Sequence, residues 1–138
     1  MRHWGTVVAC AALSLAAGCK NREECEKARL ATARAWKDVR ELAVNQKMTA
    51  ADEDLHRSDA QKADWVKAWT GFENRADLLS SSFQTEQITW DPAAQGKKKL
   101  RDEFEAFSTS NPGHGTESFR TLLKGAEDFT AQAEKACK

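Results

Sequence analysis

Four cysteines and three histidines are the side chains best suited to nucleophilic, redox or metal chemistry in this chain of 138 residues. The cysteines are Cys10, Cys19, Cys25 and Cys137, and none forms a Cys-x-x-Cys motif. His3, His56 and His114 lie far apart, and none belongs to a His-Glu-x-x-His motif. Phosphate-binding loops and Gly-x-Ser-x-Gly elbows are absent from the sequence as well. The sequence therefore predicts a non-enzymatic protein with no cofactor and no catalytic residues.

The densest group of potential metal ligands is the run Asp52-Glu53-Asp54-Leu55-His56. The run lacks the glycine and the ligand spacing of a calcium-binding loop. We therefore favour a solvated acidic loop or a first helical turn, where carboxylates suit the positive end of the helix dipole. Asp52, Asp54 and His56 stay as weak candidates for a metal site.

A second candidate segment, residues 113–118, places glycines and hydroxyls before a predicted helix. Backbone N–H groups at a helix start can hold an anion, and His114 near Thr116 and Ser118 also suggests a hydrolase. No carboxylate that would orient the histidine can be identified, so a turn with a helix cap is the favoured interpretation. We keep His114 as a candidate partner-binding residue.

Charge is balanced, with 21 basic and 21 acidic side chains, which argues against a nucleic-acid partner because such proteins carry a basic excess or a basic face. The run Lys97-Lys98-Lys99 with Arg101 could touch anionic lipid head groups. Acidic residues at 102, 103 and 105 interrupt this basic face, so a solvated surface is favoured.

The N-terminal segment is typical of a secretory signal, with Arg2 before an apolar run over residues 7–17. A membrane-spanning helix would need roughly 20 apolar residues, so this run is too short. The residues Leu15-Ala16-Ala17-Gly18-Cys19 resemble the lipobox of bacterial lipoproteins. Ala16 stands where that family prefers leucine, with Leu15 one place earlier. An ordinary secreted protein with an unmodified Cys19 is the alternative.

This resemblance implies that residues 1–18 are a signal peptide that is removed and that Cys19 is acylated on its sulfur and on its new amino group. Several acyl chains anchor a protein stably in a bilayer, where one would be marginal. Residues 19–24 would then form a lipidated tether, and residues 25–138 the folded domain. Lys20 is not the aspartate that retains many lipoproteins in the inner membrane, which favours the outer membrane, facing the periplasm, or else the cell surface.

Residues 19–138 predict an all-α fold, because alanine is frequent there while valine and isoleucine are scarce. Apolar residues spaced three or four apart predict helices over 21–44, 58–83, 92–107 and 116–137. We expect a loop with one short helical turn over 45–58 and a second loop over 108–115. The helix caps are expected at Asn21, Ser58, Asp91 and Thr116. Four such helices predict an antiparallel up-down four-helix bundle.

The core stripes of this bundle can be predicted from the same spacing. The clearest stripe, with spacing 4-3-4-3-4, is Trp65, Trp69, Phe72, Ala76, Leu79 and Phe83. The first helix contributes Cys25, Ala28, Thr32, Trp36, Val39 and Ala43, and the last contributes Phe119, Leu122, Leu123, Ala126, Phe129, Ala133 and Cys137. Trp90 fits no stripe, so it either packs onto the helix that follows, which we favour, or stays exposed to bind a partner.

Cys25 and Cys137 remain once Cys10 is removed and Cys19 is acylated, and an oxidising compartment favours their pairing. In a bundle with an even number of helices these cysteines lie at the same end, which we call the disulfide end. An odd number would separate them far beyond the roughly 7 Å Cα limit. The closed loop of about 110 residues would stabilise the fold by about 4–5 kcal/mol in the chain-entropy model. Two free thiols, or bonds to another chain, are the alternatives.

Together these features favour a membrane-anchored envelope lipoprotein that acts as a non-catalytic helical module and binds another envelope protein. A bundle that binds a small ligand or a metal, between its helices or at residues 52–59, is the alternative. Because Cys19 is so near Cys25, we expect the disulfide end to lie close to the membrane. The loops over 45–58 and 108–115 would then face away from it.

Overall fold

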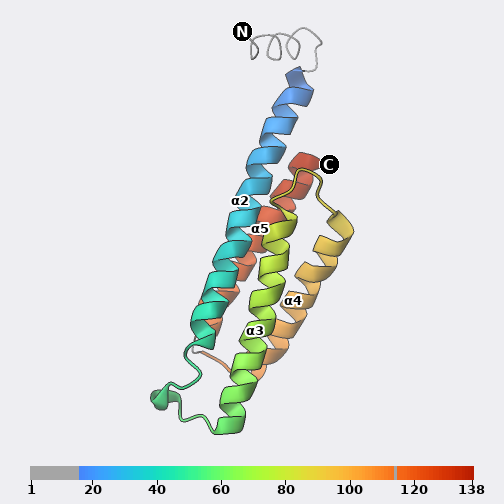
Figure 1. Cartoon of the computed structure of the whole chain (residues 1–138). Coiled ribbons are helices and arrows are strands. Elements are labelled where there is room, and N and C mark those ends of the chain that lie inside the picture. The colour runs from blue at the N-terminus through green and yellow to red at the C-terminus, as the bar shows by residue number, and fades with distance from the viewer. Residues whose placement is uncertain (1–15, 114) are drawn as a thin grey trace.

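The computed structural model describes residues 16–113 and 115–138. Its elements are α2 (Ala16–Lys47), the 3-10 helix η1 (Glu53–Leu55), α3 (Asp59–Ser82), α4 (Trp90–Ser110) and α5 (Thr116–Cys137). The four long helices alternate in direction, and each packs against its two neighbours in the order α2, α3, α4, α5 and back to α2 (Figure 1). The predicted all-α, up-down four-helix bundle is confirmed. Within the described ranges, every helix is too short or too polar to cross a membrane.

The two ends of the bundle differ in what they carry (Figure 1). The disulfide end holds the start of α2, the connection over residues 83–89 and the C-terminus. The opposite end, which we call the far end, holds the α2–α3 connection with η1 and the α4–α5 connection. The first turns of α2 project beyond the other three helices at the disulfide end.

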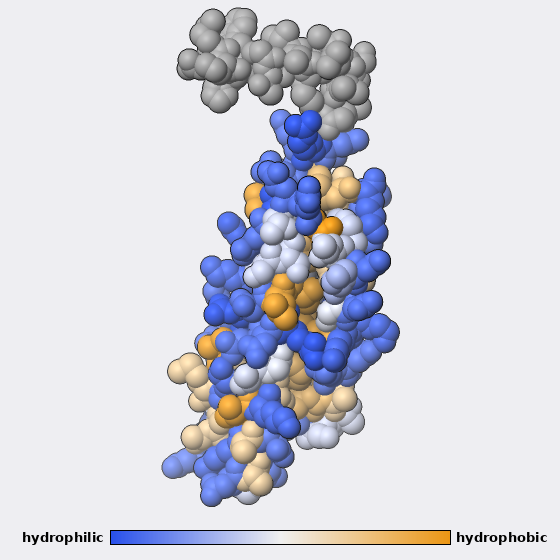
Figure 2. All heavy atoms as spheres, turned by 45° about the vertical axis from the view of Figure 1, so that its right-hand side comes forward, coloured by the Kyte–Doolittle hydropathy of each residue, from blue (hydrophilic) through white to orange (hydrophobic). Residues whose placement is uncertain are grey.

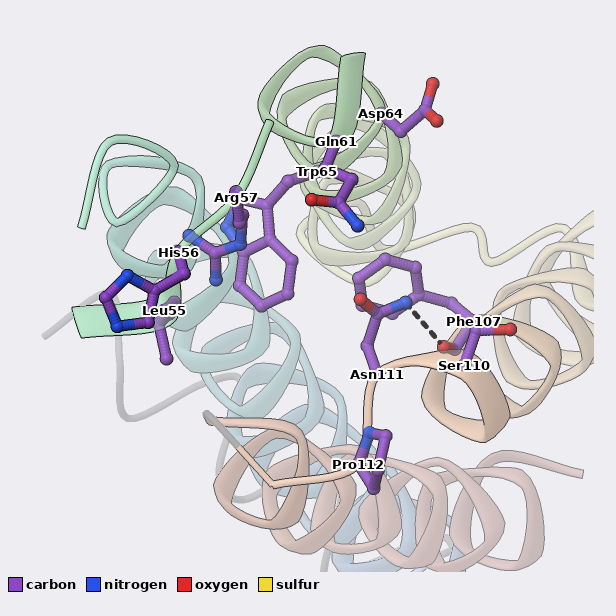
Figure 3. Close-up of a pocket in the computed structure, with 10 residues that line it drawn as sticks. All are labelled: Leu55, His56, Arg57, Gln61, Asp64, Trp65, Phe107, Ser110, Asn111 and Pro112. Carbon is purple, nitrogen blue, oxygen red and sulfur yellow. Dashed lines mark hydrogen bonds between the residues drawn. The ribbon is translucent and has the colours of Figure 1, made fainter. Parts of the chain in front are cut away.

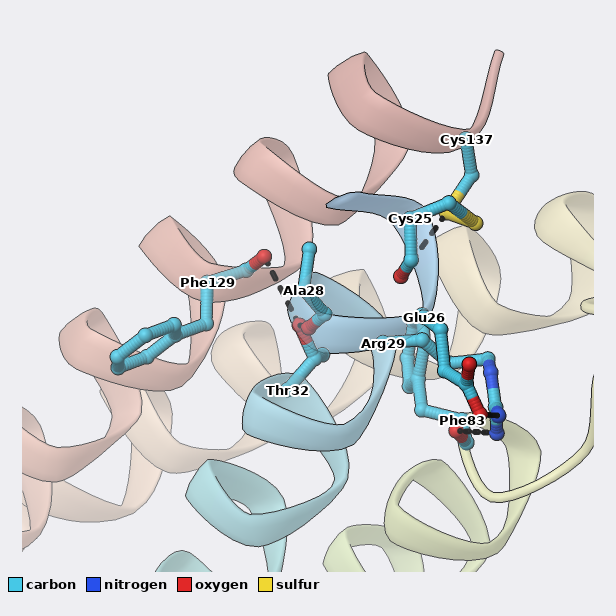
Figure 4. Close-up of a disulfide and its surroundings, with 8 residues drawn as sticks. All are labelled: Cys25, Glu26, Ala28, Arg29, Thr32, Phe83, Phe129 and Cys137. Carbon is cyan, nitrogen blue, oxygen red and sulfur yellow. Dashed lines mark hydrogen bonds and ion pairs between the residues drawn. A yellow bond between two sulfur atoms is a disulfide. The ribbon is translucent and has the colours of Figure 1, made fainter. Parts of the chain in front are cut away.

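The predicted disulfide between Cys25 and Cys137 is present, with Cα atoms 4.7 Å apart (Figure 4). Beside it, the buried Arg29 of α2 donates a hydrogen bond of 3.0 Å to the carbonyl oxygen of Phe83. A cation at this position suits the negative end of the α3 dipole. The disulfide therefore ties α5, and Arg29 ties the end of α3, to the same two turns of α2.

Hydrogen bonds made by two side chains of α2 join this helix to α5. The Thr32 hydroxyl lies 2.9 Å from the carbonyl oxygen of Phe129 (Figure 4), and the Trp36 indole N–H donates to the Thr130 hydroxyl oxygen at 2.9 Å. Thr32, Trp36 and Thr130 are all buried. The burial of such polar groups costs little free energy of folding when each group has a hydrogen-bond partner.

The apolar face predicted for the last helix is partly wrong. Leu122 and Phe129 are 36% and 40% exposed. Phe119, Leu123, Ala126 and Ala133 are buried on α5 as predicted, and Thr116 and Thr130 are buried in addition. The close approach of α2 accounts for this rotation, because Thr130 must face Trp36 and Phe129 is then turned outward.

The stripe predicted on the second helix is confirmed, since all six of its residues are buried, five on α3 and Phe83 at its C-cap. Its two tryptophans and Phe72 join rings from α4 and α5, with centroids 4.7–5.9 Å apart. This aromatic cluster consists of Trp65, Trp69, Phe72, Phe104, Phe107 and Phe119. Trp36 is buried as well, as predicted. Edge-to-face geometry predominates around Trp69, as the quadrupoles of aromatic rings prefer.

Helix starts match the predicted caps in one case of four. Ser58 forms the expected capping box with Gln61. Asn21 is no cap, because α2 already begins at Ala16 and the alanines there favour helix. The α4 helix begins at Trp90 with Thr89 as its cap, so Asp91 lies within the first turn, where its charge still suits the dipole. The cap expected at Thr116 is described with the far end below.

Ion pairs, rather than apolar contacts alone, hold α4 to α5. Arg101 of α4 makes two hydrogen bonds to Glu127, at 2.6 and 2.9 Å. Arg120 of α5 reaches back to Glu105 at 2.9 Å and to the Ser108 hydroxyl at 2.9 Å. The hydrogen bond from Arg120, followed by that from Arg101, holds the pKa of Glu105 below its ordinary value.

This network predicts a loss of stability in acid. Because the pKa of Glu105 is lower in the folded than in the unfolded chain, its contribution is complete above pH 4.5 and is lost as the pH falls through the folded value. Urea unfolding at pH 7 and pH 3 should show that Glu105→Gln loses less stability on acidification than the unmodified chain, by about 1 kcal/mol or less because solvent screens the pair. Arg120→Gln should reduce the acid sensitivity in the same direction. Equal acid sensitivity in all three proteins would contradict the assignment.

Candidate binding pocket at the far end

The acidic run proposed as a metal site forms a helix cap. The Asp52 carboxylate accepts the Asp54 backbone N–H at 3.0 Å and thereby caps η1. The side chains of Asp52, Asp54 and His56 are exposed. Across residues 16–113 and 115–138, no group of three or more His, Cys, Asp or Glu side chains is arranged to hold a metal ion. The expected loop with one helical turn is confirmed for residues 48–58.

The second candidate segment turns the chain from α4 into α5. Gly115, with φ of 90°, is the residue before the first turn of α5, so the prediction that Thr116 would be the cap is wrong. Thr116 is instead buried, and its hydroxyl donates to the carbonyl oxygen of Gly113. Ser118 is exposed on α5. His114 lies outside the described residues.

Trp90 is half-buried, and its ring packs against Phe83, the residue that caps the end of α3. Its ring lies 5.9 Å from that of Phe83, and the Lys138 ammonium lies 5.3 Å from its centroid. The expected packing onto its own helix is therefore wrong, since Trp90 is itself the first residue of α4. In the basic stretch that follows, Lys98 pairs with Asp102 at 2.6 Å, as expected for a solvated face.

An open pocket of about 560 Å³ lies at the far end, between the start of α3 and the end of α4 (Figure 3). Pockets of a few hundred cubic ångströms that combine apolar walls with a few polar groups are the usual form of ligand sites. Its walls are formed by Leu55, His56, Arg57, Gln61, Asp64, Trp65, Phe107, Ser110, Asn111 and Pro112.

Arg57 is the central polar group of this far-end pocket. Its guanidinium lies over the Trp65 ring, 3.8 Å from the centroid (Figure 3). Its Nη1 donates to the carbonyl oxygens of Thr49 and Ala50. Burial lowers the pKa of Arg57, and the charge of Asp52 partly offsets this effect. An arginine stays charged under such conditions, so the pocket carries a fixed cation stacked on an aromatic ring.

The apolar floor of the pocket is the outer edge of the aromatic cluster. The Trp65 and Phe107 rings have centroids 5.5 Å apart. Trp65 is held in place because its indole N–H donates to the Gln46 carbonyl oxygen at 2.6 Å. Across the pocket, the Asn111 amide N–H donates to the Phe107 carbonyl oxygen at 3.0 Å, and the amide oxygen faces the α3 side (Figure 3).

Positive φ angles occur in both far-end connections, at His56 in the first and at Gly113 and Gly115 in the second. His56 has φ of 48°, a conformation that few residues other than glycine adopt, and its N–H donates to the Glu53 carbonyl oxygen. Gly115 lies so close to the side chain of Gln46 that an added Cβ would collide with it. The second connection therefore lies against Gln46 of α2, whose carbonyl oxygen also accepts from Trp65.

Sequence reasoning placed Trp65 in the core but missed the pocket that it borders. Arg57, Phe107 and Asn111 were not predicted as site residues, because the α2–α3 connection that holds Arg57 and the end of α4 that holds Phe107 and Asn111 meet only in the folded chain. The available signal was weak and consisted of an arginine just before the Ser58 capping box.

A second, shallower depression of about 400 Å³ lies between α2 and α5. It contains the outward-turned Phe129 together with Leu30, which is 49% exposed. Apolar side chains also reach the surface elsewhere, as narrow interrupted patches among hydrophilic residues (Figure 2). On the face of the molecule that Figure 2 shows, these patches are narrow and are interrupted by hydrophilic residues, as is common for isolated exposed apolar residues.

Comparisons of the chain with protein-family models, curated proteins and solved structures give no match.

The backbone conformation of the α4–α5 connection predicts that two glycine substitutions, one there and one within α3, have opposite effects. Gly115→Ala should lower the free energy of unfolding by about 1–2 kcal/mol, because alanine is strained at this positive φ and Gln46 must move. Gly71→Ala is the matched control, since its Cβ would meet no neighbour within 4 Å in the middle of α3. That control should be stabilising by up to about 1 kcal/mol. Urea unfolding measures both, and equal effects would show that Gly115 is not required for the turn.

Proposed function

We propose that the chain is a lipid-anchored helical module of the cell envelope that binds an envelope protein with its far end and catalyses no reaction. The observation that carries the proposal is that two features lie at opposite ends of the bundle. The residues nearest the lipobox-like cysteine lie at the disulfide end, whereas the far-end pocket opens at the opposite end.

The geometry of α2 supports a short, stiff tether. Residues 19–24 belong to α2, and an α-helix rises about 1.5 Å per residue, so Cys25 lies about 9 Å along the helix from Cys19. The disulfide fixes Cys25 to Cys137, which keeps that end of the bundle beside the bilayer. The far end then faces away from the membrane, toward the periplasm for an outer-membrane anchor or outward for a cell-surface one.

A binding module for a small ligand is the second candidate, and the size and lining of the far-end pocket favour it. The two candidates use the same pocket and differ in whether its occupant is part of a protein. Metal binding at residues 52–59 is a weaker form of this candidate, because the Asp52 carboxylate already serves as a cap.

Acylation predicts different behaviour for two cysteines of the N-terminal segment. Cys19→Ser should abolish the added mass of the acyl chains and release the protein from the membrane fraction. Cys10→Ser is the matched control, because the proposed cleavage removes this residue, and it should leave both properties unchanged. Intact-mass measurement and fractionation of bacteria that express the full chain test this. A Cys19→Ser protein that stays membrane-bound would refute the anchor.

Partner binding at the far end predicts position-dependent crosslinking in native membranes. A photoreactive amino acid at exposed Asp64, on the pocket rim, should form an adduct of one discrete mass. The matched control is exposed Gln87 at the disulfide end, which should give no such adduct. A protein adduct at Asp64 that no longer forms when the pocket is blocked supports the proposal that the far end binds a protein. Adducts at Gln87 alone would place the binding surface at the wrong end.

A further inference from the structure

We infer that the far-end pocket binds a free carboxylate attached to an apolar or aromatic residue, the chemistry of a polypeptide C-terminus. The inference rests on the proposed function, because it takes the far end as the binding end. Three groups on three walls of the pocket would each recognise one part of such a ligand.

The guanidinium of Arg57 offers the site for the carboxylate. Its hydrogen bonds to described residues, at Thr49 and Ala50, both use Nη1. The Nε and Nη2 groups have no acceptor within the described ranges, and together they form the edge of a guanidinium that pairs with a carboxylate through two parallel hydrogen bonds. Stacking on Trp65 holds the guanidinium plane in position before a ligand arrives.

The partly exposed ring of Phe107, beside the buried ring of Trp65, offers the surface for the side chain of the last residue. The two rings stand 5.5 Å apart at the pocket floor, with Leu55 and Pro112 on its margins. Phe107 is the one ring of the aromatic cluster that is only partly buried, although the rings around it are buried. An apolar side chain placed there would cover the exposed part of the cluster and remove it from water.

Asn111 offers an acceptor for the backbone N–H of the same residue. Its amide N–H is committed to the Phe107 carbonyl oxygen, which fixes the orientation of the amide. The oxygen faces across the pocket toward α3 and accepts no hydrogen bond from a described residue (Figure 3). A carboxylate at Arg57, a side chain on the Phe107 ring and an N–H at Asn111 match the three substituents around one Cα atom.

Calorimetric titration of the full chain in detergent tests the inference with four probes. These are a six-residue peptide ending in phenylalanine, its C-terminal amide, N-acetylphenylalanine and N-acetylphenylalaninamide. The free-acid peptide should bind, and amidation should weaken its binding at least tenfold, because it removes the charge that pairs with Arg57. Equal binding of acid and amide, or no binding by any probe, would overturn the inference. If N-acetylphenylalanine binds as tightly as the peptide, the carboxylate site stands and the polypeptide source is overturned.

Two pairs of variants assign the binding to the pocket. Arg57→Gln should weaken the free-acid peptide at least tenfold, whereas Arg34→Gln, an exposed arginine of α2, should not. Arg57 also holds residues 49–50, so a second pair of variants is used that leaves this contact intact. Ser110→Trp, at an exposed position that lines the pocket, should block binding of the free-acid peptide. Thr109→Trp, at an exposed position outside the pocket, should not. Binding unaffected by both Arg57→Gln and Ser110→Trp would overturn the site.

The crosslinking at Asp64 separates this inference from the proposed function. If all four probes fail but the pocket-dependent adduct at Asp64 appears, the module stands and only the ligand class is wrong. If the probes bind and the adduct is absent, the pocket chemistry stands and the protein partner is wrong.

Discussion

The close pairing of α2 with α5 is the contact on which the other features of the bundle depend. Small and hydroxyl side chains let the two helices approach until Thr32 reaches the backbone of Phe129 and the Trp36 indole reaches Thr130. The disulfide closes the same pair at one end. Because these two helices hold the first and last parts of the fold, α3 and α4 must complete the ring as a connected hairpin. That arrangement places their two outer connections at the far end.

The helix α4 is held by a different kind of interaction, and this matters for the pocket. Its apolar face meets the aromatic cluster, while Arg101 and Arg120 link it to α5 through carboxylates. Partly exposed ion pairs of this type contribute little energy each, but their geometry fixes rotation about the helix axis. The rotation of α4 decides that Phe107 faces Trp65, and therefore that an aromatic floor exists beneath Arg57.

Much of the fold could be predicted from local spacing, and the failures have physical causes. The stripe from Trp65 to Phe83 and the Cys25–Cys137 bond were predictable because helical periodicity and helix number decide them. The outward position of Phe129 was not, because a hydrogen bond between Trp36 and Thr130, from distant parts of the chain, sets the rotation of α5. A spacing rule assigns the more apolar phenylalanine to the core in preference to threonine. In this bundle, however, Thr130 is buried and Phe129 is exposed.

The pocket was beyond such reasoning because its walls come from three segments whose meeting depends on two backbone conformations. Gly115 allows the turn that brings α5 against Gln46, and His56 adopts a positive φ so that Arg57 can fold back over Trp65. A histidine in that conformation costs free energy that the surrounding contacts must offset. The contacts that do so are those of Arg57 with Thr49 and Ala50, at the pocket itself. The strained His56 and the stacked Arg57 therefore form one local unit, which lies against the end of α2 and opens at the far end of the bundle.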